Sequence, residues 1–400
     1  MTKKSLSFPI FVTAFVAAAS PAFAQETLSI GFTASKTGAL SEVSLAQVRG
    51  FELWRDEVNA AGGIRAGGKK YKVELKSYDD ESQTVRVQEL YARLITQDKA
   101  QFLFGPVSSG LSAIAAFVSE ENGRLLLSTA ADPKIFRLGN RNLFQVTTPV
   151  TRSFDGAVTA LKVRIPNARV ALVSKDDPFT RVIAQATRDL VKSEGLTLVL
   201  DEAYAASLAD FAPLAGKVAS ANADALFGGG HIADGLALAR ALHVQKTGLK
   251  WLTLLAAPDA PHFAELGNVA LGVSWPSQWA PRVSYKPDFG PSAQVFTRRF
   301  SDKFKSAPTD LAAAGYASGL VLANAIEKAG TVEPGKVGAA LNQIDATTLF
   351  GRVKFATDSK EHGLQIAHEM ILRQWQRKAG RLVPEVISPV SIKTADALGL

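Results

Sequence analysis

The 400-residue chain contains no cysteine, and this absence excludes several kinds of site. Disulfides are impossible, so an exported chain of this composition has to be stabilised by its hydrophobic cores. A lipidated N-terminal cysteine is excluded as a membrane tether. Histidine is also scarce: there are five, without a His-x-x-x-His pair, and no cysteine is available to complete a zinc set. We therefore expect no metal site and no cofactor.

Long apolar runs are missing outside the first 24 residues. That segment has Lys3 and Lys4 at its start, an apolar stretch at 8–19, and the small-x-small sequence Ala-Phe-Ala at 22–24. This order predicts a secretory signal peptide that is cleaved after Ala24. A membrane anchor is the alternative, but it needs about 20 apolar residues, and this segment is shorter. We expect a soluble mature chain outside the cytoplasm.

Runs of like charge are missing as well. The formal net charge is +8, of which the signal segment carries two positive charges, and no five or six basic residues follow one another. Basic segments such as KKYKVELK at 69–76 also contain acids. The pattern gives little support to a nucleic-acid partner, whereas a modest basic balance suits an acidic ligand.

Short apolar runs alternate with helical patterns along most of the chain. In a first block we expect strands at 28–32, 71–78, 101–104 and 124–127, and helices at 43–60, 83–98 and 109–121. In a second block we expect strands at 170–174, 196–200, 225–228 and 251–255, and helices at 179–194, 211–220 and 232–245. This order is typical of parallel sheets covered by helices on both sides.

The remaining segments have no sheet of their own. They comprise helices expected at 292–305 and 310–329 and late strands expected at 351–355 and 366–375. The economical solution is an α/β fold of two doubly wound parallel-sheet lobes, joined by a hinge that the chain crosses three times. The predicted boundaries are 25–147 plus 277–364 for lobe 1, and 148–276 plus 365–400 for lobe 2.

The turn at 105–110, with the sequence Gly-Pro-Val-Ser-Ser-Gly, joins a predicted strand to a predicted helix. The first turn of a helix exposes N–H groups and the positive end of the helix dipole, which together favour anions. Ser108 and Ser109 can add hydroxyl donors, so the turn can receive a carboxylate or a phosphate. Ser109 can equally serve only as the helix cap.

In open parallel sheets, ligands bind outside the carboxyl ends of the strands. The loops there are 33–38, 105–110 and 128–132 in the first lobe, and 174–179, 228–231 and 256–259 in the second. The Gly-Gly-Gly run at 228–230 serves either close packing or ligand approach. His231 beside it is a candidate polar contact, with a surface or capping histidine as the alternative.

Enzyme signatures are not found in this sequence. The region of Ser108 has Pro106 where a nucleophile elbow requires glycine, and the glycines at 228–230 lack the Lys-Ser/Thr ending of a phosphate-binding loop. The acidic run Asp-Asp-Glu at 79–81 is more typical of a solvated turn than of an acid-base pair. We expect no catalysis.

Several short motifs in a fixed order resemble the periplasmic substrate-binding proteins of ABC importers, specifically the branched-chain amino acid and amide type. The motifs lie at 30–32, 37–38, 50–54, 59–64, 78–81, 104–109, 314–317 and 350–355. The resemblance covers nearly the whole mature chain. It implies the type I periplasmic-binding-protein fold, a periplasmic monomer, and a membrane permease as partner.

The resemblance also implies how a ligand carboxylate is held. The matching positions are Ser108 and Ser109 in the turn, Ala130 and Asp132 after the next strand, and Thr37 in a loop that closes over them. The second lobe then closes by a hinge motion and displays a surface to the permease.

Three departures from the family pattern bear on the ligand. Asp132 stands where a hydroxyl-bearing residue is usual, and Gly230 stands where an aromatic is usual. No acid aligns securely with the one that pairs the ligand amine, and Asp259 and Asp176 are the nearest candidates. An aspartate beside the site of a ligand carboxylate repels that anion, unless the aspartate points away or pairs with a cationic group of the ligand.

Aromatic residues near the predicted cleft widen the range of ligands. Phe179, Trp275 and Trp279 can stack on a planar group or simply pack in the core or hinge. The expected ligand is therefore an amino acid, an amide, a urea-like compound or an aromatic carboxylate. Two further functions stay open: a ligand-sensing partner of a receptor or chemotaxis system, and an exported hydrolase whose catalytic groups converge from distant segments.

Overall fold

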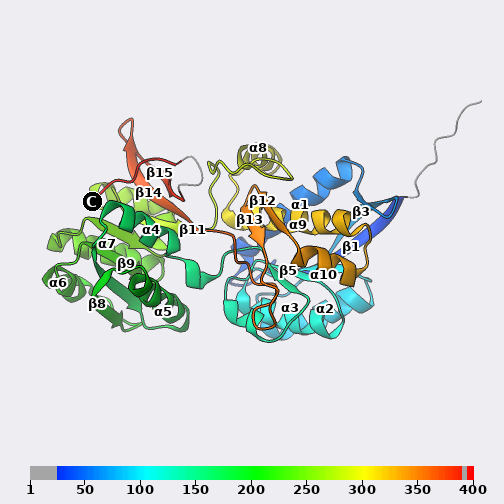
Figure 1. The fold of residues 1–400 in the computed structure, drawn as a ribbon, viewed down its shortest axis with the longest axis horizontal. Helices are drawn as coiled ribbons and strands as arrows, with labels where there is room; N and C mark the ends of the chain where they lie inside the picture. The colour runs from blue at the N-terminus through cyan, green and yellow to red at the C-terminus, as the bar shows by residue number, and fades with distance from the viewer. Residues whose placement is uncertain (1–24, 390–393) are drawn as a thin grey trace, which may run out of the picture.

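The computed structural model describes residues 25–389 and 394–400, so the predicted signal peptide and its cleavage site lie outside the described residues. Two separate sheets, each flanked by helices, lie side by side along the long axis (Figure 1). The predicted fold of two parallel-sheet lobes is confirmed. We call the lobes built on these sheets the first and the second lobe.

The first sheet has six strands in the order β2-β3-β1-β4-β5-β6. All neighbours are parallel except β2 and β3. The strands are β1 (Gln25–Ala34), β2 (Ile64–Ala66), β3 (Lys69–Asp79), β4 (Phe102–Phe104), β5 (Leu126–Ser128) and β6 (Leu143–Gln145). The helices within this stretch are α1 (Ser41–Ala60), α2 (Thr84–Thr96) and α3 (Ser109–Glu121).

The second sheet has seven strands in the order β15-β14-β11-β10-β9-β7-β8, in which β14 and β15 are the antiparallel members. The strands are β7 (Arg169–Lys175), β8 (Thr197–Tyr204), β9 (Ala225–Gly229), β10 (Trp251–Leu254), β11 (Ser274–Ser277), β14 (Ile371–Lys378) and β15 (Arg381–Ser388). Its helices are α4 (Asp155–Arg164), α5 (Pro178–Ser193), α6 (Ala212–Ser220) and α7 (Ile232–Gln245).

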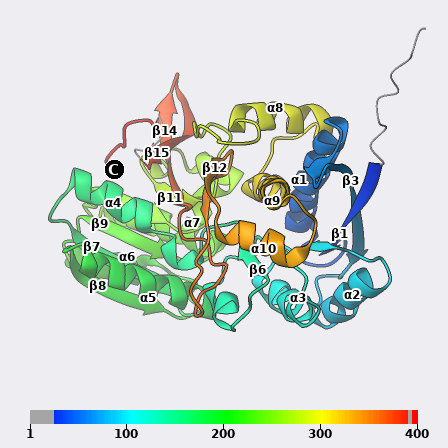
Figure 2. The same cartoon turned by 45° about the vertical axis from the view of Figure 1, so that its right-hand side comes forward.

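Later segments return to the first lobe. They are α8 (Ala293–Phe304), α9 (Asp310–Ala329), α10 (Pro334–Asn342) and the hairpin of β12 (Asp345–Thr348) and β13 (Gly351–Lys354). Figure 2 shows α9 and α10 on the same side of the molecule as α1 and β1. A Cβ on Gly50 of α1 would lie 2.1 Å from the carbonyl oxygen of Ala312 in α9, so glycine permits close contact between the two helix backbones.

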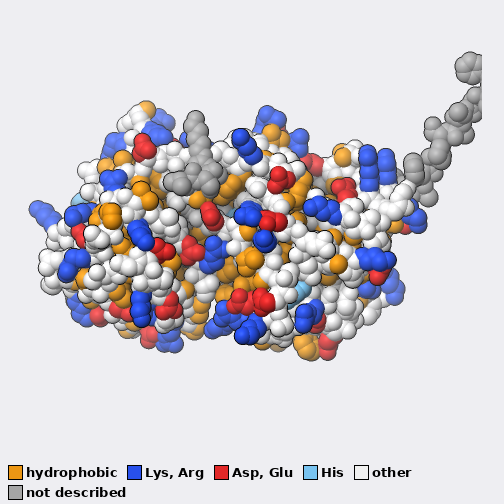
Figure 3. All heavy atoms as spheres, viewed as in Figure 1, with side chains coloured by type: hydrophobic (Ala, Val, Ile, Leu, Met, Phe, Trp, Pro, Cys, Tyr) orange, Lys and Arg blue, Asp and Glu red, His pale blue; other side chains and the backbone are white. Residues whose placement is uncertain are grey.

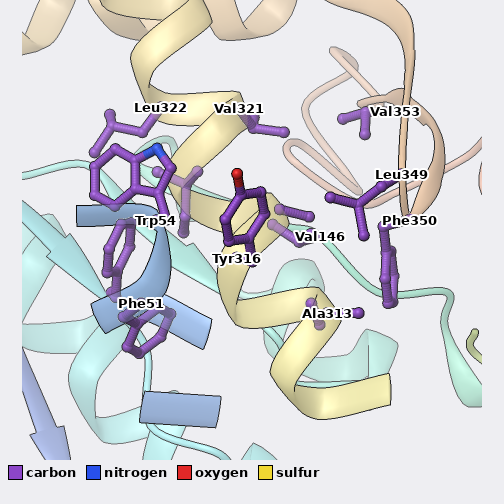
Figure 4. Packing of buried hydrophobic residues seen from close by; sticks show 14 of the residues in the cluster. Phe51, Trp54, Val146, Ala313, Tyr316, Val321, Leu322, Leu349, Phe350 and Val353 are labelled. Carbon is purple, nitrogen blue, oxygen red and sulfur yellow. The ribbon is translucent and has the colours of Figure 1, made fainter. Parts of the chain in front are cut away.

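The largest hydrophobic cluster lies where α1 and α9 meet. Phe51 and Trp54 of α1 lie beside Tyr316 and Leu322 of α9 (Figure 4), and all four side chains are buried. A Cβ on Gly319 would come within 2.0 Å of the Trp54 ring, so a side chain there would displace the indole. Close packing of this kind fixes α9 on the first sheet.

Some helices and strands differ from those predicted from the sequence, because tertiary contacts rather than local sequence signals determine them. The strand expected at 366–375 begins only at Ile371, because the segment before it crosses between the lobes. There, Arg152 Nη1 donates to the carbonyl oxygens of Ile366 and His368 at 3.2 Å each, so these carbonyls serve a side chain rather than a sheet. Helix α4 was not expected, because it buries only Ala157, Val158 and Leu161.

The three crossing segments meet at Thr148. Its backbone N–H donates to Gln278 Oε1 at 2.9 Å, and its carbonyl accepts from Gln278 Nε2 at 2.9 Å. Its hydroxyl contacts the Nδ1 of His368, and His368 Nε2 lies 2.6 Å from the carbonyl oxygen of Phe350. Since Thr148, Gln278 and His368 come from the first, second and third crossing, these side chains tie the hinge together.

The surface carries interspersed charges, and Figure 3 shows Lys and Arg mixed with Asp and Glu on the visible face. Most ion pairs are exposed, such as Lys162–Glu194 at 2.8 Å, and contribute little stability. None of the described helices is long and apolar enough to cross a membrane.

Candidate functional site

The loops after β4 and β5 are joined by direct hydrogen bonds. Ser109 Oγ accepts from the backbone N–H of Asp132 at 3.2 Å. Within the loop after β5, Ser128 Oγ accepts from the N–H of Ala130 at 3.0 Å. Ser112 connects the two loops further, because its hydroxyl lies 3.2 Å from that of Ser128. The structure thus brings Ser108, Ser109, Ala130 and Asp132 together at the carboxyl ends of two adjacent parallel strands.

The two serines of the turn have different roles. Ser108 caps α3, because its Oγ accepts from the N–H of Leu111 at 3.1 Å. Ser109 is the first residue of the helix, and its hydroxyl is the acceptor in its contact with Asp132. A hydroxyl has one hydrogen to donate, so Ser109 can still donate outward. The N–H groups of Ser109 and Gly110 lie in the first turn, where helix geometry supplies no acceptor.

We call the loops after β4 and β5 together the cradle. Buried polar side chains hold the cradle in place. Gln47 on α1 donates from Nε2 to the carbonyl oxygen of Gly105 at 2.8 Å and accepts from Thr129 Oγ1 at 2.7 Å. Gln145 donates to the carbonyl oxygen of Ala130 at 2.7 Å. Sequence analysis missed both glutamines. The sequence did contain a signal for Gln47, because this polar residue lies one turn before Phe51 on the face of α1 that is buried.

The carboxylate of Asp132 serves its own turn. Its Oδ1 accepts from the N–H of Lys134 at 2.9 Å and caps the short 3-10 segment η1 (Pro133–Arg137). This bond occupies Oδ1 within the loop of Asp132 itself.

The loop that contains Thr37 is fixed by Asp79. Lys36 N, Thr37 N and Thr37 Oγ1 donate to this carboxylate at 2.9, 3.4 and 3.0 Å. Burial raises the pKa of Asp79, but these bonds and one from the N–H of Glu81 outweigh it and hold the pKa below its ordinary value. Thr37 itself is exposed, so its contact with a ligand stays a prediction.

Asp80 differs from the expected solvated turn, and that expectation was wrong for this residue. Its side chain is fully buried and accepts from Thr33 Oγ1 at 2.7 Å, Ser35 Oγ at 2.6 Å and the N–H of Ser82 at 3.0 Å. A buried carboxylate with three donors anchors the loops after β1 and β3 to each other.

In the second lobe, the loops after β7 and β9 meet at His231. Its N–H donates to Asp234 Oδ2 at 3.0 Å, and Asp234 is paired with Lys175 at 3.1 Å. His231 Nε2 lies 3.3 Å from Asp177 Oδ2, and its ring stacks on Phe179 with centroids 6.2 Å apart. His231 therefore lies at the start of α7. Its ring and the ring of Phe179 form an exposed aromatic pair.

The space at Gly230 is taken by a tyrosine from β8, which is separated from β9 by β7 in the sheet. A Cβ on Gly230 would lie 2.6 Å from the hydroxyl of Tyr204, at the end of β8. Burial, with the charges of Asp234 and Asp177, raises the pKa of Tyr204 and keeps it protonated. An aromatic at position 230 would clash with Tyr204, which explains this departure from the family pattern.

Asp259 is engaged within its own lobe. Its Oδ1 accepts from Arg373 Nη1 at 2.6 Å and from Trp275 Nε1 at 3.1 Å. The guanidinium of Arg373 also lies over the Trp275 ring, 4.9 Å from its centroid. Trp275 and Trp279 are buried, which favours their packing role over ligand stacking. Asp176 pairs with Arg181 at 2.6 Å on the exposed surface.

With this geometry in place, comparison with known proteins decides the family. The family model described as "Periplasmic binding protein" matches residues 27–381. The chain belongs to this family. One similar relative of the binding protein is the Leu/Ile/Val-binding protein BraC3 of Rhizobium johnstonii, which is 26% identical over 389 residues and covers 96% of this chain and 99% of its own.

Solved structures of similar fold cover most of this binding protein. The Streptococcus pneumoniae binding protein LivJ, in complex with isoleucine, has a TM-score of 0.67 and 23% identity over 91% of this chain and all of its own. A putative branched-chain amino acid ABC transporter protein from Silicibacter pomeroyi has a TM-score of 0.79 and 19% identity, covering 93% and 99%. A solute-binding protein from R. palustris, in complex with benzoate, has a TM-score of 0.65 and 19% identity, covering 94% and 99%.

The predicted site residues of this binding protein are of two kinds. The first lobe presents hydroxyl and backbone N–H donors, which suit a carboxylate. The second lobe presents the Phe179–His231 pair, which suits an apolar or planar group. Both sets follow the carboxyl ends of parallel strands.

Proposed function

We propose that this binding protein captures a small carboxylate-bearing metabolite in the periplasm and delivers it to the membrane permease of an ABC importer. The observation that carries the proposal is the hydrogen bond between Ser109 Oγ and the N–H of Asp132, because it places two strand-end loops in one cradle. In this reading Ser108, Ser109, Ala130 and Asp132 surround the carboxylate, and Thr37 lies in the loop above them.

The second lobe completes the site in this proposal. Phe179 and His231 contact the remainder of the ligand, and Asp259 lies at the same edge of the second sheet. Solved structures with this fold are complexes with isoleucine or benzoate, so an aliphatic amino acid and an aromatic carboxylate are the first classes to test. An amide or a urea-like compound is next.

Capture involves closure about the hinge at Thr148. We take lobe 1 as 25–147 plus 277–364 and lobe 2 as 148–276 plus 365–400, which places Thr148 at the first crossing. The closed form presents a surface to the permease that the open form lacks. The protein works as a monomer after cleavage behind Ala24, and it returns its ligand chemically unchanged.

A thermal-shift screen of the chain from Gln25 tests this function. Isoleucine, benzoate, an aliphatic amide and a urea are the probes, since a ligand that binds only the folded state raises the melting temperature. A hit should bind with one-to-one stoichiometry in calorimetry and be recovered intact by mass spectrometry. Conversion of the probe would establish an enzyme and overturn the proposal. The absence of binding by all four classes would also overturn the proposal.

A further inference from the structure

Four acids lie in the strand-end loops that we expect to face the ligand. These loops are 33–38, 105–110 and 128–132 in the first lobe, and 174–179, 228–231 and 256–259 in the second. Their acids are Asp132, Asp176, Asp177 and Asp259. An amino-acid ligand carries an ammonium group, which a carboxylate holds most strongly when it leaves water. The bonds that these four carboxylates already make therefore bear on the class of ligand.

Asp132 and Asp176 bond to groups close to them in the sequence. Asp132 Oδ1 accepts from the N–H of Lys134 at 2.9 Å. Asp176 Oδ1 lies 2.6 Å from Nε of Arg181, in the first turn of α5, and both side chains are exposed. Each of these two acids thus has a partner on its own side of the site.

Asp177 is the N-cap of α5. Its Oδ1 accepts from the N–H groups of Phe179 and Thr180 at 2.9 and 3.0 Å, and its Oδ2 lies 3.3 Å from Nε2 of His231. Burial raises the pKa of this carboxyl, but the two N–H groups and the charge of His231 outweigh it and hold the pKa below its ordinary value. Both oxygens of Asp177 therefore face donors of the protein.

Asp259 has a partner from a distant part of the chain. It ends the 3-10 segment η3 (Ala257–Asp259), which follows β10. Its Oδ1 accepts from Arg373 Nη1 at 2.6 Å and from Trp275 Nε1 at 3.1 Å. Trp275 and Arg373 face each other across the antiparallel pair of β11 and β14, and the guanidinium lies 4.9 Å from the centroid of the indole. The Arg373 side chain is only 16% exposed, so packing holds its positive charge against Asp259.

Three helix ends add positive potential at the same loops. Helices α3, α5 and α7 begin at Ser109, Pro178 and Ile232, each directly after one of these loops. The N-terminal end of a helix favours an anion and disfavours a cation. An ammonium group in this position would be repelled by the helix ends and would meet Asp259 already paired.

We propose that this binding protein selects carboxylates that lack an α-ammonium group, and that Arg373 sets this preference by pairing with Asp259. The inference rests on the proposed function and names the ligand class of the same site. An amino acid would lose the water around its ammonium group without gaining an unpaired carboxylate. The acid with the same carbon skeleton and no amino group has no such loss. Arg373 is a positioning residue, because it acts on the ligand through Asp259.

Pairs of ligands that differ only in the amino group test the preference. Isoleucine and 3-methylvalerate share one carbon skeleton, and phenylglycine and phenylacetate share another. Calorimetric titration of the chain from Gln25 at neutral pH gives the dissociation constant of each compound. In at least one pair we expect the carboxylate without the amino group to bind about tenfold or more tightly than the amino acid. Amino acids that bind as tightly as their partners, or more tightly, would overturn the inference.

Replacing Arg373 should shift the preference toward the amino acid. Arg373→Met keeps an unbranched stem beside Trp275 but leaves Asp259 without its cation. Relative to the parent chain, the affinity for isoleucine should rise about fivefold or more against that for 3-methylvalerate. The double variant Arg373→Met/Asp259→Asn should return this ratio to the parent value, since the freed acid is gone. An unchanged ratio in folded Arg373→Met would reject the role of Arg373.

Arg377→Met is the matched control on the same strand. Arg377 is exposed, and its Nη2 donates to Asn268 Oδ1 at 2.9 Å. Its replacement removes one positive charge from β14 without affecting the partner of Asp259. The ratio of the two affinities should stay at the parent value, and a shift as large as that of Arg373→Met would reduce the effect to net charge and reject the specific pairing.

Asp259→Asn gives a test that does not depend on the folding of an Arg373 variant. If Asp259 is already neutralised, this change should leave the preference for 3-methylvalerate in place. A selective loss of isoleucine affinity would instead show that Asp259 receives the ammonium group, and the inference would be wrong.

The same titrations separate failure of this inference from failure of the proposed function. If the amino acids bind at least as tightly as the matching carboxylates, the capture of a carboxylate-bearing metabolite stands and the selection against an ammonium group is rejected. If none of the four compounds binds, the proposed function is itself overturned, and the inference with it.

Discussion

Ser109 Oγ accepts a hydrogen bond from the backbone N–H of Asp132 at 3.2 Å, and this contact joins two loops that are separate in the sequence. Each loop follows one strand of a parallel pair, β4 and β5. Because Ser108 caps the helix, the hydroxyl of Ser109 is left to donate toward a ligand. Hydrogen bonds within the protein thus hold the two loops together.

Replacing Ser109 should separate binding from stability. Ser109→Ala removes one donor to a bound carboxylate, so we expect ligand affinity to fall by about 1 to 2 kcal/mol, the scale of a charge-assisted hydrogen bond. The melting temperature should fall only slightly, because the N–H of Asp132 loses its acceptor while Ser108 keeps the cap. Calorimetry and thermal unfolding of the same preparation measure both quantities.

Ser119→Ala is the matched control on the same helix. Its hydroxyl donates to the carbonyl oxygen of Ala116 at 2.9 Å and lies near the far end of α3. It should lower stability slightly and leave affinity unchanged. The opposite pattern in Ser109→Ala, lower stability with unchanged affinity, would return Ser109 to a purely structural role.

Gln47 should affect both stability and affinity. Gln47→Met keeps the length of the side chain but leaves the carbonyl oxygen of Gly105 and the hydroxyl of Thr129 without their partner. We expect the free energy of unfolding to fall by about 1 to 3 kcal/mol. Affinity should fall as well, because both cradle loops loosen. Urea unfolding with ligand titration checks this, and full retention of affinity would show that the loops hold their geometry without Gln47.

The aromatic pair on the second lobe should set ligand preference. Phe179→Ala and His231→Ala remove the stacked rings, and we expect an aromatic carboxylate to lose about 0.5 to 1.5 kcal/mol of affinity more than an aliphatic one. Phe117→Ala, an exposed phenylalanine on α3, is the control. Equal losses for both ligand types would remove the pair from the specificity of the site.

Asp310 should make the folded chain less stable near neutral pH. Its folded pKa of about 6 lies above the ordinary value of 3.8, so the unfavourable contribution is complete above the folded pKa and disappears below the unfolded one. Asp310→Asn should therefore raise the free energy of unfolding by about 1 to 2 kcal/mol at pH values above 6, with the gain vanishing toward pH 4. Unfolding curves over this range test the sign. A variant less stable than the parent at neutral pH would show that the charged form of Asp310 is stabilised in the folded chain.

His368 should have the opposite pH dependence. Burial lowers its pKa from 6.5 to about 4, while the carbonyl of Phe350 acts to raise it. The neutral ring is needed in the folded hinge, so stability is complete above pH 6.5 and is lost as the pH falls toward 4. In His368→Gln this part of the acid sensitivity should be absent, although stability at neutral pH is lower because the contacts with Thr148 and Phe350 are lost. Identical pH profiles for the two chains would contradict the assignment.

Local signals predicted much of the fold. Helix α3 runs over 109–121 as expected, because a serine cap precedes an apolar-periodic segment. The proximity of the loops at 105–110 and 128–132 was also predictable, since turns at the carboxyl ends of adjacent parallel strands have to lie near one another. The role of their residues in ligand binding stays a prediction. The exact lobe boundaries and the ligand contacts of Thr37, Phe179, His231 and Asp259 stay predictions.

What the sequence by itself determined is the order of most strands and helices and the two-lobe architecture, because these depend on periodicity and on turns of a few residues. What only the tertiary structure decided are the pairings between distant residues: Gln47 with Thr129, Thr148 with His368, Asp259 with Arg373. A buried polar group needs a partner, but its own sequence neighbourhood does not specify which one. That choice is made by packing, when helix and strand ends from different parts of the chain come together.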